Sequence, residues 1–179
     1  MARQLLRSLT WVPVGYAVGD LLVAVHRVEG ASMRPTLNPA GDADRAAAAA
    51  ASSHDVVLAE KMSVRLYRWS RGDVVLLRSP VEPRRLLIKR IVALEGDFVS
   101  PPRASGLAAV RVPAGHGWVE GDNGGASEDS GAFGPVPLAI LQARAVAVVW
   151  PPSRWGALAR RQPPGRVLAR SDAAREAWW

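Results

Sequence analysis

The chain has 179 residues, enough for one domain with its own hydrophobic core. It contains no cysteine, which excludes disulfides and thiolate metal sites, and its three histidines lie too far apart in sequence to suggest a zinc site. The net charge of +7 comes from 23 basic residues, but these are scattered rather than clustered. A general bias toward arginine therefore explains the charge better than a surface for nucleic acid or anionic lipid.

Residues 9–25 form the longest apolar stretch of the chain, and Arg3 and Arg7 precede it. As a helix this stretch would span roughly 25 Å, slightly less than a hydrocarbon core. Asp20 interrupts it, and no small-residue cleavage site follows it. We predict an N-terminal membrane anchor over residues 1–27, with a buried core helix or a cleaved signal peptide as alternatives. The two arginines would keep the N-terminus on its original side while the rest is exported.

The alanine-rich residues 40–53 are of low complexity and indicate a flexible insertion or a short nascent helix. Beyond them come short runs rich in Val, Leu and Ile, each bounded by Gly, Pro, Asp or Ser. We expect these runs to form strands of a mainly antiparallel β fold, at residues 55–59, 64–67, 73–77, 86–94, 110–112 and 143–150. Residues 158–179 are an Arg/Pro/Ala-rich tail to which the sequence assigns no function.

Ser32 lies in a turn that begins with Gly30 and contains Pro35. Such a turn can present a serine hydroxyl together with a backbone N–H, as a nucleophile and an oxyanion donor require. Met33 follows the serine directly, and we group it with Gly30 as a supporting residue. Most serines in turns of this kind are structural, so the turn alone does not establish catalysis.

Lys89 is one of only two lysines in the chain and sits inside an apolar run. In a strand it shares a face with Leu87 and Ile91. A lysine acts as a base near neutral pH only if its pKa falls by roughly 3 units from about 10.4, and burial among apolar side chains can cause that fall. The structural alternative is a lysine at a strand edge whose amine reaches solvent.

A polar, glycine-rich segment covers residues 121–130. Its plain interpretation is a long loop. Its functional interpretation is a loop that supports a catalytic site through Ser127 and Asp129.

Taken together and in this order, these motifs resemble the signal peptidase I family of membrane-bound Ser/Lys endopeptidases, in particular its mitochondrial inner membrane protease branch. The resemblance covers residues 28–137, and residues 150–155 are similar to the subunit-2 branch of that mitochondrial protease. It rests on Ser32-Met33-Arg34-Pro35-Thr36-Leu37, Arg71-Gly72-Asp73-Val74-Val75, Lys89-Arg90-Ile91-Val92-Ala93-Leu94-Glu95-Gly96-Asp97, Gly121-Asp122-Asn123 and Phe133-Gly134-Pro135-Val136.

The resemblance implies an antiparallel-sheet catalytic core over residues 28–157 behind an N-terminal membrane helix. It implies Ser32 as nucleophile, Lys89 as general base and Ser127 as the residue that orients the lysine, with no metal or cofactor. Substrates would be precursor proteins with hydrophobic sorting segments, cut after small residues. It also implies a heterodimer with a homologous subunit in the mitochondrial inner membrane, the catalytic domain facing the intermembrane space.

The chain departs from the family pattern at three places. Gly131 replaces an arginine that many bacterial relatives carry, which removes an ion-pair partner of Asp129. Gly30 stands where some bacterial members have a serine hydroxyl for the oxyanion hole, leaving more of that task to the N–H of Ser32. The third departure is the alanine-rich insertion.

Two other functions are compatible with parts of the sequence. A self-cleaving repressor of the LexA type uses the same Ser/Lys chemistry, but residues 1–27 are too short and too apolar for a DNA-binding domain. A non-catalytic subunit that stabilises a homologous protease would not need both Ser32 and Lys89. A thylakoid or bacterial plasma membrane is the alternative location.

Overall fold

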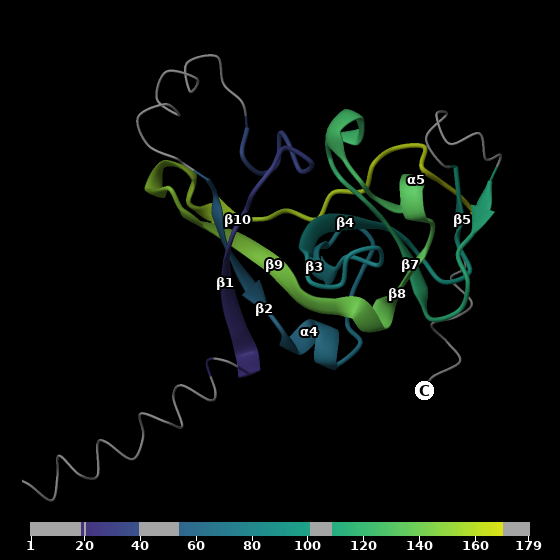
Figure 1. The fold of residues 1–179 in the computed structure, drawn as a ribbon, viewed down its shortest axis with the longest axis horizontal. Coiled ribbons are helices and arrows are strands. Elements are labelled where there is room, and N and C mark those ends of the chain that lie inside the picture. Colours follow the sequence, from purple (N-terminus) through teal and green to yellow (C-terminus); the bar gives the residue numbers. More distant parts are fainter. Residues whose placement is uncertain (1–18, 20, 40–53, 101–108, 170–179) are drawn as a thin grey trace, which may run out of the picture.

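The computed structural model describes residues 19, 21–39, 54–100 and 109–169, and its main feature is a curled antiparallel sheet (Figure 1). The strand order is β1-β2-β9-β3-β4-β7-β8, with β10 beside β9. The strands are β1 (Val23–Arg27), β2 (Val56–Glu60), β3 (Val74–Arg78), β4 (Leu86–Leu94), β7 (His116–Glu120), β8 (Val136–Pro137), β9 (Leu141–Trp150) and β10 (Gly156–Ala157). The prediction of a mainly antiparallel β fold is confirmed.

A second, three-stranded sheet lies beside the first, in the order β11-β5-β6. Its strands are short: β5 (Phe98–Val99), β6 (Val110–Arg111) and β11 (Val167–Ala169). Residues 19, 21 and 22, at the start of the described chain, are helical. The later helices are single turns, at α4 (Met62–Arg65), η2 (Gly124–Ala126), α5 (Ser130–Phe133), η3 (Leu138–Ile140) and η4 (Pro152–Arg154).

Strand β3 explains why the sheet has a hydrophobic core on both faces. Alternate side chains of a strand point to opposite faces, and four consecutive residues of β3 are buried. Val74 and Leu76 pack on one face with Met33, whereas Val75 and Leu77 pack on the other. Met33, expected as a supporting site residue, is thus a core residue that is 2% exposed.

The strand expected at residues 64–67 is wrong. Residues 62–65 form helix α4, in which the N–H of Arg65 donates to the carbonyl of Lys61. Leu66 and Tyr67 follow in an exposed turn, and Tyr67 has a φ of 54°. With those two apolar side chains in solvent, no buried face was available to hold the segment in a sheet.

The end of the predicted membrane anchor lies in the sheet. Residues 23–27 form β1, which pairs with β2 from Val23 opposite Glu60 to Arg27 opposite Val56. Residues 1–18 and 20, which hold most of the predicted anchor, lie outside the described residues. Within the described part of the chain, no helix is both long and apolar enough to span a bilayer. The anchor therefore stays a prediction, and a helix through residue 25 is wrong.

The first part of the predicted tail belongs to the fold. After β9 the chain pairs again as β10, and residues 167–169 pair with β5 as β11. The segment between them runs along the sheet and links it to the smaller sheet (Figure 1). Residues 170–179 lie outside the described part.

Two residues that flank the alanine-rich insertion, Asn38 and Asp55, bind each other. The N–H of Asn38 donates to the Asp55 carboxylate and the N–H of Asp55 donates to the Asn38 side chain, both at 2.7 Å. Asp55 is buried and also binds Arg154. Residues 40–53 themselves lie outside the described part, but the two ends of the insertion are held together without them.

Deletion of residues 42–52 is therefore expected to leave the protein folded and active. The Asn38–Asp55 pair would survive, and shortening a loop changes stability by less than about 1 kcal/mol. Thermal unfolding and peptide cleavage measured on the deleted and full-length chains test this expectation. A large loss of either would show that the insertion packs on the domain or contacts substrate.

Candidate active site

Ser32 lies in a compact turn between β1 and β2. The N–H of Arg34 donates to the carbonyl of Ala31 at 3.2 Å, and the N–H of Leu37 donates to that of Met33 at 2.9 Å. Met33 and Leu37 are buried in the core, which fixes the turn against the sheet. Gly30 opens the turn with a φ of +84°, a conformation that other residues adopt rarely. A supporting role for Gly30 stays a prediction, and its positive φ is the feature that would serve it.

Lys89 comes from the middle of β4 and is 2% exposed. Leu87 and Ile91, two positions away on either side, belong to the core on that face, as the alternation predicted. The Lys89 amine donates to the Ser127 hydroxyl at 3.1 Å. The sequence-predicted pair of Lys89 and Ser127 therefore meets in the structure.

Burial lowers the pKa of Lys89 from its ordinary value. Asp129 opposes this effect, since a nearby negative charge favours the protonated amine. Arg85 lowers the pKa further and Glu128 raises it. The net direction is the one that a general base needs, because a lower pKa increases the fraction of neutral amine near neutral pH.

Gly121 is the point where the Ser32 turn meets the residue that holds Lys89. A Cβ atom at this glycine would lie 2.3 Å from the Ser127 hydroxyl oxygen and 2.4 Å from the Ser32 carbonyl oxygen. The N–H of Asn123 donates to that same carbonyl at 2.9 Å, and its side chain donates to the Ala31 carbonyl at 3.1 Å. The turn with Ser32 is thus docked directly on the loop that carries Ser127.

Asp122 joins the lysine strand to the serine turn. Its carboxylate accepts two hydrogen bonds from Arg90, at 2.8 and 2.7 Å, and a third from the Thr36 hydroxyl. Burial by itself raises the pKa of Asp122, but the bonds from Arg90 and Thr36 and the charges of Arg90 and Arg161 outweigh burial and lower it. Asp122 is therefore a carboxylate that receives strong, charge-assisted hydrogen bonds.

Asp129 supports the loop through backbone groups. One carboxylate oxygen accepts from the N–H of Gly121 and the other from the N–H of Gly131, each at 3.0 Å. The second bond caps the short helix α5. Gly131 has no side chain to pair with Asp129 and binds it through its backbone N–H alone. Asp129 thus holds in place the glycine on which Ser32 and Ser127 meet.

Arg90, Thr36 and Asn123 are parts of the site to which the sequence assigned no role. All three lie inside the motifs quoted above. Arg90 neighbours Lys89 in a strand, so its side chain had to point to the opposite face, and a charged residue in an apolar strand predicts a buried partner. Nothing in the spacing identified Asp122 as that partner. Among the described residues, no group of three His, Asp or Glu side chains is placed to hold a metal ion.

Comparison with known proteins identifies the family of the chain. A family model described as "Signal peptidase, peptidase S26" matches residues 1–105 and 101–150. The chain belongs to the signal peptidase family. Proteins named "Mitochondrial inner membrane protease subunit 2" are similar to it. The protein from Danio rerio is 48% identical over 155 residues, covering 87% of this chain and 79% of that relative.

The same name applies to relatives from Homo sapiens, 47% identical, and from Saccharomyces cerevisiae, 37% identical. The alignments cover 87% and 86% of this chain, and 83% of each relative. The signal peptidase family and these relatives make the chain a serine peptidase of the signal peptidase type, located at the mitochondrial inner membrane.

Replacement of Gly121 by Ala is expected to reduce cleavage by about 10² or more, because its new methyl group must push the Ser32 turn away from Ser127. Gly124→Ala is the matched control, since a Cβ there meets nothing within 4 Å. Cleavage rates of both variants, with circular dichroism as the folding control, test the contact. Near wild-type cleavage by Gly121→Ala would contradict it.

The exposed ion pair of Arg85 and Glu128, 3.3 Å apart, is expected to tune the pH dependence of cleavage. Glu128→Gln removes a charge that raises the pKa of Lys89, so the rise of cleavage with pH should shift to lower pH. Arg85→Gln should shift it to higher pH. Asp129 remains in both variants. The log rate against pH for the two variants measures these shifts, and a shift in the same direction for both would refute the expectation.

Proposed function

We propose that the protein is an endopeptidase in which Ser32 is the nucleophile and Lys89 its general base. The observation that carries this proposal is the buried Lys89 amine bound to Ser127, at the glycine on which the Ser32 turn docks. A lysine amine needs a hydrogen-bond partner to be held in one direction, and Ser127 supplies it. A purely structural lysine would keep its amine in solvent, at much lower desolvation cost.

The reaction proceeds by acyl transfer. Neutral Lys89 takes the hydroxyl proton of Ser32 as the serine oxygen attacks the scissile carbonyl, and the carbonyl oxygen becomes an oxyanion. The backbone N–H of Ser32 donates to that oxyanion. The ammonium of Lys89 then gives its proton to the departing amine, leaving an acyl group on Ser32. Neutral Lys89 next takes a proton from water as the water oxygen attacks the ester carbonyl. The Lys89 ammonium then returns this proton to the Ser32 oxygen as the bond between that oxygen and the acyl carbon breaks, which releases the new C-terminus and restores Ser32 and neutral Lys89.

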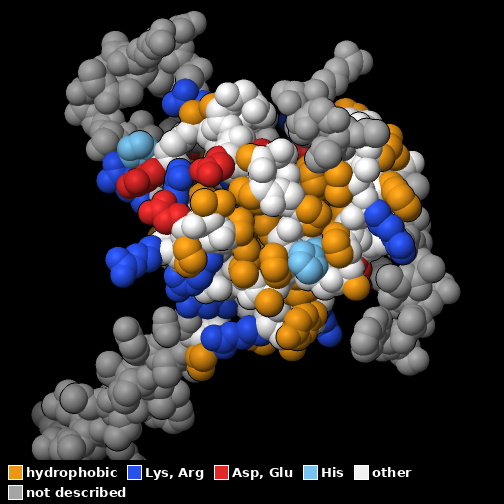
Figure 2. Space-filling view, turned by 45° about the vertical axis from the view of Figure 1, so that its right-hand side comes forward, with side chains coloured by type: hydrophobic (Ala, Val, Ile, Leu, Met, Phe, Trp, Pro, Cys, Tyr) orange, Lys and Arg blue, Asp and Glu red, His pale blue; other side chains and the backbone are white. Residues whose placement is uncertain are grey.

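The substrates that fit this site are precursor proteins with hydrophobic sorting segments, cut after small residues. Two surface features are consistent with a catalytic domain that lies at the surface of a bilayer. At the end of the predicted anchor, the chain leading into and along β1 exposes Leu21, Leu22, Val23 and Val25. Apolar side chains also cover much of the face shown in Figure 2, with charged side chains mostly toward its margins. With Arg3 and Arg7 retained in the matrix, the catalytic domain faces the intermembrane space.

The relatives' names describe subunits, and we infer a complex with a homologous protease subunit. Pull-down of the full-length chain from mitochondrial membranes, analysed by mass spectrometry, tests this inference. Recovery of the chain with no other signal-peptidase-type protein would count against a heterodimer.

The test of the nucleophile is cleavage of a precursor that carries a hydrophobic segment followed by small residues. Full-length protein in phospholipid vesicles should release a product whose new N-terminus, read by mass spectrometry, follows a small residue. Ser32→Ala should release none. Equal cleavage by Ser32→Ala would remove Ser32 from the mechanism.

Lys89→Arg is expected to reduce kcat/KM by about 10⁴ while the fold persists, because arginine keeps the charge but has no neutral form at accessible pH. The only other lysine of the chain, Lys61, provides the matched control, and Lys61→Arg should cleave like wild type. The measurement is kcat/KM on one peptide for both variants. Wild-type turnover by Lys89→Arg would exclude Lys89 as the general base.

A further inference from the structure

The segment from Gly156 to Ala169, here called the strap, crosses the main sheet on the side of Arg90. Backbone bonds hold it at both ends: the N–H of Leu158 donates to Val146 and the N–H of Ser100 donates to Arg166, at 2.8 and 2.9 Å. Figure 1 shows it running from beside β10 to β5. Near its start, the Ala159 carbonyl accepts a hydrogen bond from Arg90 at 3.3 Å. The strap thus contacts the residue that binds Asp122.

Arg166, near the end of the strap, binds Glu120 at the end of β7. Its guanidinium donates to both carboxylate oxygens, one of them at 3.1 Å. The indole N–H of Trp118 donates to the same carboxylate at 2.7 Å. Glu120 is only 9% exposed, so its charge is held by these partners and hardly at all by water.

Glu120 and Arg90 are direct neighbours across two strands. They are Cα partners in the β4–β7 ladder, and partners in a ladder project their side chains to the same face. Glu120 lies two positions before Asp122, the carboxylate that Arg90 actually binds. Arg90 is therefore a buried arginine with two carboxylates as neighbours, Glu120 and Asp122. The strap residue Arg166 already pairs with Glu120.

Arg90 is buried, and only 1% of the residue is exposed. The direction of its guanidinium is held by its hydrogen-bond partners. These are Asp122, the Ala159 carbonyl and the Gly72 carbonyl, the last at 2.7 Å.

We propose that Arg166 is a positioning residue of the active site. Because the Arg166 guanidinium pairs with Glu120, the Arg90 guanidinium remains paired with Asp122. Without Arg166, Glu120 becomes a buried carboxylate that lacks its cation, and Arg90 is the cation beside it. Arg90 then turns toward Glu120, Asp122 loses its two bonds from the lysine strand, and the Ser32 turn shifts relative to Lys89. This inference rests on the proposed Ser32/Lys89 function.

The test compares Arg166→Ala with the double variant Arg166→Ala/Glu120→Gln in the full-length protein, with kcat, KM and the unfolding temperature measured for each. Arg166→Ala should lower kcat by about 10², the cost of a misplacement of about 1 Å, and change KM little. The double variant should recover most of kcat, because a neutral amide does not compete for Arg90. Because Glu120→Gln also removes the unpaired buried charge, the double variant should regain stability as well. The kcat values are therefore compared at a temperature at which the unfolding curves show both variants fully folded.

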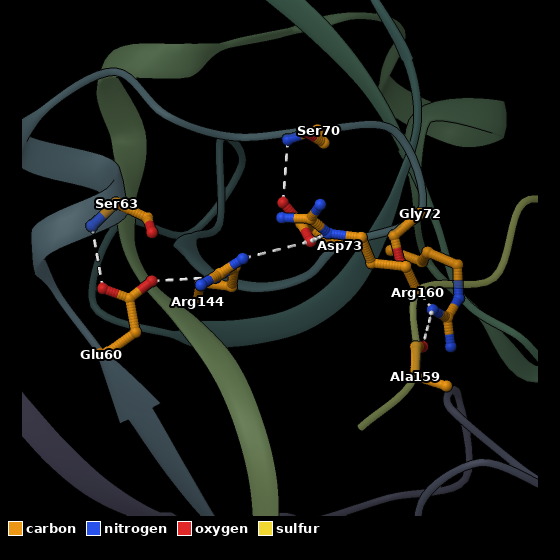
Figure 3. A network of polar contacts seen from close by, with 9 residues as sticks. Glu60, Ser63, Ser70, Gly72, Asp73, Arg144, Ala159 and Arg160 are labelled. Carbon is orange, nitrogen blue, oxygen red and sulfur yellow. Dashed lines mark hydrogen bonds and ion pairs between the residues drawn. The ribbon is translucent and has the colours of Figure 1, made fainter. Parts of the chain in front are cut away.

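Arg160→Ala is the matched control from the same strap. Arg160 binds Asp73 at 2.6 Å, but Asp73 keeps a second cation, Arg144, and the N–H of Ser70 (Figure 3). This variant also loses one ion pair and should keep kcat near that of wild type. Arg166→Lys should lie close to wild type too, because a cation remains at Glu120.

Two results would overturn the proposal: wild-type kcat in Arg166→Ala, or equal loss of kcat in the single and double variants. If Arg166→Ala unfolds at the assay temperature, Arg166→Gln with and without Glu120→Gln makes the same comparison. Ser32→Ala, measured beside them, separates this proposal from the proposed function. Cleavage by Ser32→Ala would refute the dyad, whereas its inactivity with an unimpaired Arg166→Ala would refute only the role of Arg166.

Discussion

The carboxylate of Asp122 is the group on which the geometry of the candidate site depends. It lies between Arg90, which follows Lys89 on β4, and Thr36, four residues after Ser32. The chain between Thr36 and Arg90 includes the insertion and strands β2 and β3, so no local constraint fixes the two segments relative to each other. Breaking a buried ion pair by removing one partner costs about 3–5 kcal/mol. This contact therefore keeps the serine turn and the lysine strand together.

The alternation of β4 makes this arrangement possible with two consecutive residues. Lys89 points to one face, where burial lowers its pKa and Ser127 receives its amine. Arg90 points to the other face, where it is 1% exposed and binds Asp122 and the Gly72 carbonyl. A shift of one residue in the β4 register would exchange the two faces. The pairing of β4 with β3 and β7 thus decides which cation is the candidate base and which is structural.

Sequence patterns predicted those features that depend on residues close together in the chain. The apolar runs at β2, β3, β4 and β9 predicted these strands, and the motifs identified Ser32, Lys89 and Ser127 as candidate site residues. The expected strand at residues 64–67 was wrong, because residues 62–65 form helix α4 and Leu66 and Tyr67 follow in a turn. Local patterns also did not show that Met33 is a core residue or that residues 167–169 pair with β5. The Arg90–Asp122 and Arg166–Glu120 pairs join residues 32 and 46 positions apart, a relation that no periodicity encodes.

The most direct test of the central claim is mass spectrometry of the protein quenched in acid during turnover of a peptide ester. The account predicts an acyl group on Ser32 in the wild-type protein. It also predicts that Asp122→Asn, which weakens the bond between the serine turn and the lysine strand, accumulates this adduct far more slowly. An adduct on another residue, or acylation of Ser32 at the wild-type rate in Asp122→Asn, would contradict the account.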